Sequence, residues 1–329
     1  MARGSRSALE SLLWEEPVVA SPRHLGSQCV SCGSEECEEC GGCRVQVCAR
    51  CEALHSRQDC HLLARAAQLG LLLSPEVVMM VRLVSLSKQG GELWDHIGEP
   101  QLSSACPHQV ISFADKMVDH VQERKKDVIE WSSVEERIIN VVQKIFSEDD
   151  ISDTLLHKLY GIICTNSISI GDMICLYPIL SMINHSCAAN SVYTFNTETN
   201  SVILRAKRNI EAGEEITLCY TDPWDGQPSR KIKLMKTWFF ECRSAPHHTS
   251  QLSAPCCRCP RCCDVTEFGT NISALKCSSC REGLVLPETC QAGNVLQSLH
   301  SDLKSSRHSR QHLEMPILLQ PARLCTRDQ

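Results

Sequence analysis

The residues best suited to chemistry are the cysteines and histidines between residues 29 and 61. Three Cys-x2-Cys pairs are followed by a histidine and a further cysteine, and the set is Cys29, Cys32, Cys40, Cys43, Cys48, Cys51, His55 and Cys60. A structural zinc ion takes four such ligands in a tetrahedron, so eight candidates suit two ions. The segment is polar and has too few apolar residues for a core of its own. The pattern therefore predicts a zinc-binding module, with Cys37 and His61 as alternatives for single ligands.

A second group of reactive residue types lies between Pro178 and Asp222. Here Asn184, His185 and Cys187 directly follow an apolar run. Two strands are then expected near 191–195 and 201–205, around a turn rich in turn formers. The sequence from Gly213 predicts a second turn and a half-buried strand over 216–220 that ends on Tyr220. Each feature alone is usually structural, and only their ordered combination indicates a functional site.

A third cluster has the spacing Cys-x-Cys-x2-Cys and consists of Cys257, Cys259 and Cys262. It supplies three thiolates, whereas a tetrahedral zinc site needs a fourth ligand. Cys242 competes with Cys257 for the first place in the triplet.

Length and composition narrow the class of protein. The 329 residues leave room for two or three small domains. With 33 Lys and Arg against 39 Asp and Glu, the chain lacks the basic face that direct nucleic-acid binding requires. No secretory leader or membrane-spanning run is read, and 23 cysteines without an oxidising compartment point to zinc rather than disulfides. We expect a cytoplasmic and nuclear protein with no membrane partner.

Residues 61–160 are expected to be helical. The sequence Ser74–Glu76 supplies a cap, a proline at the first helical position and an acid in the first turn. The core-facing residues expected here are Val77, Val81, Leu83 and Val84, and Gly90 and Gly91 should end the helix. A second helix is predicted to open at the capping-box pattern of Ser132 and Glu135. Its expected core face is Val134, Ile138, Val142, Ile145 and Phe146.

Together these motifs resemble a known family. The Asn184-His185-Ser186-Cys187 box, the β segment after it and the sequence Gly213–Tyr220 resemble the C-terminal half of a SET domain. The order of the N-terminal cysteines resembles a MYND finger, and Trp14–Val19 resembles the strand that ends the first SET β-hairpin. This is the plan of the SET-and-MYND (SMYD) family, and residues 264–280 are most similar to its arthropod SmydA branch. The family's N-terminal glycine-rich turn and large C-terminal helical domain are not found.

The resemblance implies an α+β fold, in which a SET-domain β-fold is split by a MYND zinc finger and a helical insertion and is followed by a cysteine-rich post-SET region. The expected boundaries are 1–28 for truncated N-terminal SET strands, 29–60 for the MYND finger, 61–160 for the helical insertion, 161–222 for the SET core, 223–290 for the post-SET zinc region and 291–329 for a disordered tail.

The resemblance also implies how about three zinc ions are held. One ion would take Cys29, Cys32, Cys48 and Cys51, and a second would take Cys40, Cys43, His55 and Cys60. In the family the cysteine of the Asn-His-Ser-Cys box completes the post-SET triplet. Cys187 would therefore join Cys257, Cys259 and Cys262 at the third ion.

The function implied is protein-lysine N-methyltransferase, with S-adenosylmethionine as the methyl donor and histone or other protein lysines as substrates, linked to transcriptional regulation and chromatin. Tyr220 would be the catalytic residue. The residues that would contact the cofactor are Asn166, Asn184, His185 and Phe240, and those that would line the lysine channel are Ile168 and Trp238. Ile168 stands where the family has an aromatic residue. The alternative is an inactive SET/MYND interaction module that acts as a transcriptional co-regulator and binds proline-rich peptides through its MYND finger.

Overall fold

The computed structural model describes residues 4–52, 55, 57–88, 101–102, 117–146, 151–197, 199–240, 260–264, 266–276 and 284–285. The chain divides into two compact units, Met1–Asn184 with Asn190–Leu218, and His185–Ala189 with Cys219–Gln329. The predictions for Gly90, Gly91, Cys242, Cys257, Cys259 and the tail 291–329 lie outside the described residues.

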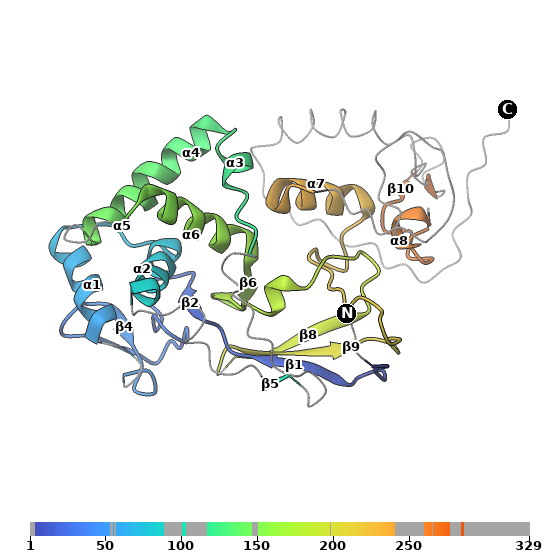
Figure 1. Cartoon of the computed structure of the whole chain (residues 1–329), viewed down its shortest axis with the longest axis horizontal. Helices are drawn as coiled ribbons and strands as arrows, with labels where there is room; N and C mark the ends of the chain where they lie inside the picture. The colour runs from blue at the N-terminus through green and yellow to red at the C-terminus, as the bar shows by residue number, and fades with distance from the viewer. Residues whose placement is uncertain are drawn as a thin grey trace. The chain divides into compact units, whose positions relative to one another are not determined.

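The first unit contains a four-stranded antiparallel sheet in the order β5-β1-β9-β8. Its strands are β1 (Ser11–Glu15), β5 (Gln101–Leu102), β8 (Ser191–Asn196) and β9 (Ser201–Ala206), and Figure 1 shows β1, β9 and β8 side by side. In β9, Val202, Leu204 and Ala206 alternate onto the buried face. The β8–β9 hairpin confirms the expected strands.

A three-stranded antiparallel sheet, in the order β2-β7-β6, lies in the same unit. Its strands are β2 (Val19–Pro22), β6 (Ser167–Ile170) and β7 (Met173–Leu176). The expectation of one strand over Trp14–Val19 is therefore wrong, because β1 ends at Glu15 and β2 begins at Val19 in a different sheet. Pro17 lies between them and has no backbone N–H to offer a ladder.

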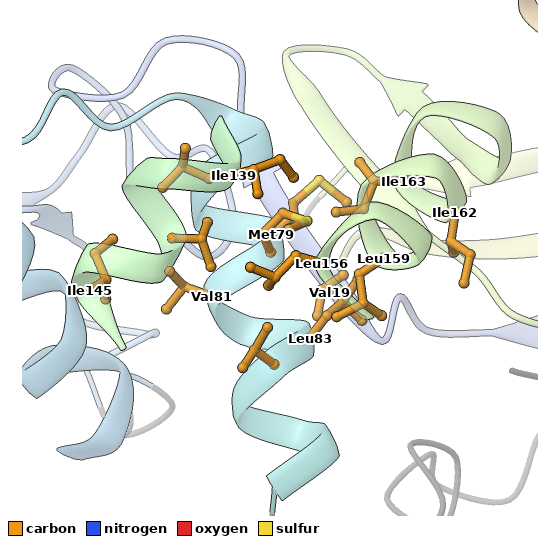
Figure 2. Close-up of a cluster of buried hydrophobic side chains, with 14 of the residues drawn as sticks. Val19, Met79, Val81, Leu83, Ile139, Ile145, Leu156, Leu159, Ile162 and Ile163 are labelled. Atoms are coloured by element: carbon orange, nitrogen blue, oxygen red, sulfur yellow. The ribbon is translucent and has the colours of Figure 1, made fainter. Parts of the chain in front are cut away.

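Helices of the first unit form its main apolar core around α2 (Pro75–Lys88). The predicted start is correct, since the Val77 amide donates to Ser74 Oγ at 3.3 Å. The four predicted core residues are buried, and so are Met79 and Met80 on other sides of the helix. Figure 2 shows Met79, Val81 and Leu83 of this helix among residues of α6 (Asp153–Asn166) and neighbouring helices. Helix α1 (Arg57–Gln68) also packs on α2.

The predicted second helix begins one turn earlier than the sequence suggested. The chain forms α3 (Val121–Arg124), α4 (Val128–Val134), a π-helix η1 (Glu135–Ile139) and α5 (Asn140–Ile145). Asp127 is the cap of α4 and accepts the Glu130 amide at 3.0 Å, while Ser132 Oγ donates to the Val128 carbonyl inside the helix. The capping box at Ser132 is thus wrong. The Glu135 carboxylate instead accepts the indole N–H of Trp131 at 2.8 Å.

The predicted core face of this helical stretch is nevertheless correct. Val134, Val142, Ile145 and Phe146 are buried, and Ile138 packs partly against the same core. Apolar spacing along the chain is preserved when a helix starts a turn earlier, so the face prediction does not depend on the cap.

The second unit is described by α7 (Gln227–Trp238), α8 (Pro260–Cys263) and the paired strands β10 (Leu275–Lys276) and β11 (Leu284–Val285). Helix α7 has Pro228 in its first turn, and it ends where Phe239 takes a left-handed conformation at φ 56°. Among the described residues, no helix has the length and apolarity needed to cross a bilayer.

A buried carboxylate fixes the chain that leads to the Asn184 box. Glu15 of β1 is 2% exposed, and its oxygens accept the amides of Ile179 at 2.8 Å and Leu180 at 2.9 Å. These amides open the 3-10 helix η2 (Leu180–Met182). Burial raises the pKa of Glu15 to about 7, although the two amide bonds oppose the shift.

The Glu15→Gln substitution should remove a pH dependence of stability. Because the folded-state pKa lies above the ordinary value of 4.5, the native state loses stability as the pH rises through about 7. The free energy of unfolding should fall by at most about 3 kcal/mol from pH 5 to pH 8 through this group. Urea unfolding of the zinc-loaded protein at both pH values measures it. The exposed neighbour offers the control Glu16→Gln, and an equal pH dependence in Glu15→Gln and wild type would contradict the assignment.

Candidate zinc and aromatic sites

The structure gathers the N-terminal ligand candidates into two groups of four. One group is Cys29, Cys32, Cys48 and Cys51, and the other is Cys40, Cys43, His55 and Cys60. Within each group all ligand atoms lie within 4.8 Å of one another. These are the sets that the family resemblance implied, and neither Cys37 nor His61 belongs to them. None of the described cysteines forms a disulfide.

The separations of the ligand atoms suit tetrahedral zinc. Sulfurs at about 2.3 Å from a zinc ion lie about 3.8 Å apart in a tetrahedron. The Cys32–Cys48 sulfurs are 3.6 Å apart and the Cys40–Cys60 sulfurs 3.7 Å. His55 Nε2 lies 3.3 Å from the Cys43 sulfur, and burial lowers the pKa of His55, which favours the neutral ring that coordinates metal. Two sites able to hold zinc are therefore present.

A short hairpin and a glycine shape the second group. Strands β3 (Glu38–Glu39) and β4 (Gln46–Val47) pair, and the loop between them carries Cys40 and Cys43. A Cβ atom at Gly42 would lie 2.9 Å from the Cys60 sulfur. Glycine is therefore the residue that leaves room for the four ligands.

Arg82 of α2 ties this module to the rest of the first unit. Its guanidinium donates to the Val30 carbonyl and Ser31 hydroxyl, both at 3.2 Å, and to the Ala20 carbonyl of β2 at 2.6 Å. It also pairs with Asp59 of α1 at 3.3 Å. One planar cation thus joins the cysteine module, a strand and two helices.

Side chains hold the segment 213–218 against the Asn184 box. Asn190, 2% exposed, accepts the Thr217 amide at 2.9 Å and donates to the Glu215 carbonyl at 2.8 Å, and the Asn184 carbonyl accepts the Leu218 amide at 2.9 Å. The prediction of a strand over 216–220 is therefore wrong. These amides bond to an asparagine side chain and to an irregular loop in place of a regular strand neighbour.

In the second unit the His185 ring bridges two predicted site residues. The Tyr220 amide donates to His185 Nδ1 at 3.0 Å, so the ring hydrogen must be on Nε2. Nε2 lies 3.2 Å from the Cys187 sulfur and donates to it. His185 and Cys187 are both buried. The ring thereby fixes a tyrosine backbone on one side and a candidate metal ligand on the other.

Aromatic rings surround Tyr220 in this unit. Its ring centre lies 5.2 Å from His185, 5.1 Å from Trp238 and 6.4 Å from Phe240, the last in an edge-to-face arrangement. The apolar cluster beneath includes Cys187, Leu234 and Cys262. The structure thus brings together His185, Tyr220, Trp238, Phe240, Cys187 and Cys262. Such a cluster offers an apolar wall with one phenol beside it.

The other predicted site residues belong to the first unit or lie outside the described residues. Asn166 ends helix α6, and its side-chain amide donates to the Val118 and Ile162 carbonyls, both at 3.0 Å. Strand β6 follows directly and begins at Ser167. Ile168 pairs with Cys175 in the second sheet, and Asn184 donates to Glu215 at 2.6 Å.

A buried ion cluster in the second unit was not predicted. Arg230 of α7 is 1% exposed and pairs with Glu267 at 2.5 Å, and it donates to the Cys262 sulfur at 3.3 Å. Glu267 also faces Arg261 at 3.3 Å. Arg230 is separated from Glu267 by 37 positions, so no local spacing could have indicated the pair.

Part of the chain matches a known protein family. The sequence model of the SET domain family matches residues 178–221. The chain therefore carries a SET-domain segment, and this segment contains the Asn184 box and Tyr220.

Parts of the chain are also similar to individual SET proteins. Histone-lysine N-methyltransferase SMYD3 of Mus musculus is 45% identical over 67 residues, which are 20% of this chain and 15% of that protein. SET domain-containing protein SmydA-8, isoform A, of Drosophila melanogaster is 38% identical over 114 residues, or 34% of this chain and 21% of that protein. Histone-lysine N-methyltransferase ASHR1 of Arabidopsis thaliana is 23% identical over 252 residues, or 72% and 50%. With the cysteine module, these matches confirm the SET-and-MYND resemblance.

The chain spans half of the length of these relatives or less. A solved structure, the SET domain of LSMT bound to lysine and AdoHcy, aligns with a TM-score of 0.39 and 12% identity over 81% of this chain and 56% of that one. The α+β fold class is confirmed by the SET segment together with the two cysteine groups.

Replacing one ligand of the first cysteine group should remove one zinc ion per chain. The Cys29→Ser substitution leaves three sulfurs around the first site, whereas Cys37→Ser changes a cysteine outside both groups. Native mass spectrometry should show one ion fewer in Cys29→Ser than in Cys37→Ser and wild type. An equal loss in Cys37→Ser would mean that Cys37 is a ligand and that the grouping is wrong.

Proposed function

We propose that this chain is a protein-lysine N-methyltransferase that uses S-adenosylmethionine to methylate histone or other protein lysines. The observation that carries the proposal is the aromatic cluster around Tyr220, at the end of the segment that matches the SET domain. Relatives that match part of this chain include proteins named lysine methyltransferases. Expected locations are the cytoplasm and nucleus, where the free thiols of the described cysteines stay reduced.

The residues present suit the demands of the reaction. A lysine side chain attacks only as the neutral amine, and an apolar channel disfavours its charged form. Rings such as Trp238 and Phe240 beside Tyr220 can supply those apolar walls. When bound, S-adenosylmethionine supplies a methyl group on a positively charged sulfur.

Tyr220 would position the amine. Its phenol hydroxyl is a polar group at the aromatic cluster. An oriented hydroxyl there can accept a hydrogen bond from the substrate amine and keep the nitrogen lone pair in line with the methyl group to be transferred. The amine nitrogen would accept the methyl group, S-adenosylhomocysteine would leave as a neutral thioether, and the methylated ammonium would lose a proton to water. The bond from the Tyr220 amide to His185 holds the tyrosine backbone from which the phenol extends.

A third zinc ion is part of the same proposal. Cys187 and Cys262 would be two of its ligands, and both fit the role, since they are buried in one cluster and each faces an N–H donor. The other two proposed ligands, Cys257 and Cys259, lie outside the described residues. Zinc here would tie the post-SET chain to the Asn184 box.

A second function is favoured by the zinc module itself. Two complete ligand groups could hold zinc and so stabilise an interaction domain that does not need S-adenosylmethionine. On this view the chain is an inactive SET/MYND co-regulator that binds proline-rich peptides.

Calorimetric titration of the zinc-loaded protein with S-adenosylmethionine separates the two functions. Binding with a dissociation constant below about 1 mM is expected for the enzyme. No heat up to that concentration would leave the interaction module as the function.

The Tyr220→Phe substitution tests the catalytic role. It should lower the rate of methyl transfer to histone and peptide mixtures by about 100-fold, because it removes one oriented polar group at the transition state. Cofactor affinity should be unchanged. The matched control is Tyr193→Phe, which removes a hydroxyl from strand β8. Full activity in Tyr220→Phe would rule out the assignment.

A further inference from the structure

Two arginines share one buried carboxylate in the second unit. Arg230 and Arg261 both pair with Glu267. Arg230 is 1% exposed and Glu267 2%, so water screens neither. A cation at this depth is stabilised when a further acceptor with negative charge lies beside it.

Hydrogen bonds account for most of the polar atoms of the cluster. Glu267 accepts Arg230, the Gln227 amide at 2.8 Å and the Ser273 hydroxyl. Arg230 also donates to the Asp225 carbonyl at 2.6 Å and to the Cys262 sulfur at 3.3 Å. Arg230 Nε is buried and has no hydrogen-bond partner among the described residues. Among the described residues, one N–H of the guanidinium is therefore left without an acceptor.

The nearby sulfurs are candidates for that acceptor. The Cys262 sulfur accepts from the guanidinium at 3.3 Å, and Cys187 belongs to the same buried cluster as Cys262. Cys187 receives the Nε2–H of His185, so each of the two sulfurs faces an N–H donor. Donors of this kind stabilise zinc-bound thiolates, which keep partial negative charge.

We infer that Arg230 is a positioning residue for the third zinc site, where it offsets the charge of the metal-bound sulfurs and orients Cys262 toward Cys187. The inference rests on the zinc site of the proposed function and goes beyond it by naming a residue that is not a ligand. Glu267 in turn holds the guanidinium in place, because a planar fork needs a fixed acceptor to keep its direction.

Zinc release tests the inference directly. In wild type, a colorimetric chelator should release three zinc ions. The kinetic phase of release that is missing in the Cys187→Ser variant identifies the ion of the third site. Arg230→Gln should weaken retention of that ion by about 10- to 100-fold and leave the other two unchanged. Arg230→Lys, which keeps the charge but loses the fork, should lie between. The matched control is Arg261→Gln, which removes the other cation on Glu267, and retention should stay within about threefold of wild type.

A double-mutant comparison separates a role at the metal from a merely structural one. If Arg230 acts through the zinc-bound sulfurs, Arg230→Gln should lower the thermal midpoint less in the Cys187→Ser background than in wild type. An equal loss in both backgrounds, or unchanged third-ion release in Arg230→Gln, would overturn the inference while leaving the third site intact. Only two ions in wild type would overturn both the site and the inference. S-adenosylmethionine binding, measured separately, reports on the proposed activity.

Discussion

The imidazole of His185 is the contact on which the organisation of the second unit depends. One ring nitrogen accepts the Tyr220 amide and the other donates to the Cys187 sulfur, so a single tautomer satisfies both. The same ring packs against Tyr220 and Phe240. A shift of the Cys187 sulfur would therefore move the His185 ring and the Tyr220 backbone that is bonded to it. A metal site and an aromatic wall are coupled here through one rigid side chain.

Local chemistry made part of this arrangement predictable from sequence. Ligands that occur as Cys-x2-Cys pairs are brought together by a single turn, so spacing alone reveals a zinc module. The pairing of Cys29 with Cys48, and of Cys40 with Cys60, needed the family resemblance, since spacing does not show which pairs interleave. Apolar periodicity likewise predicted the buried face of α2 but not that nearly the whole helix is enclosed.

Long-range polar contacts explain the errors. Alternating residues over 216–220 suggested a strand, but the amides of this segment are taken by Asn190, Asn184 and His185, which no pattern within the segment could indicate. The predicted helix cap at Ser132 is wrong because Asp127, five residues earlier, is a competing acceptor for the first amides of the helix. The role of Arg230 was not predicted for the same reason, because its ion-pair partner Glu267 is distant in sequence.

The charge of the second unit connects these observations. Burying a guanidinium is rarely a source of stability, because the desolvation penalty offsets most of the attraction between the ions. On the inference above, a buried Arg230 beside Glu267 and the Cys262 sulfur would serve as the counter-charge of an anionic centre. Thiolates gathered by a metal would form such a centre, and they would give both the Arg230 fork and the His185 N–H an acceptor of the right sign. The electrostatics of α7 and the geometry of Tyr220 would then depend on the same two sulfur atoms.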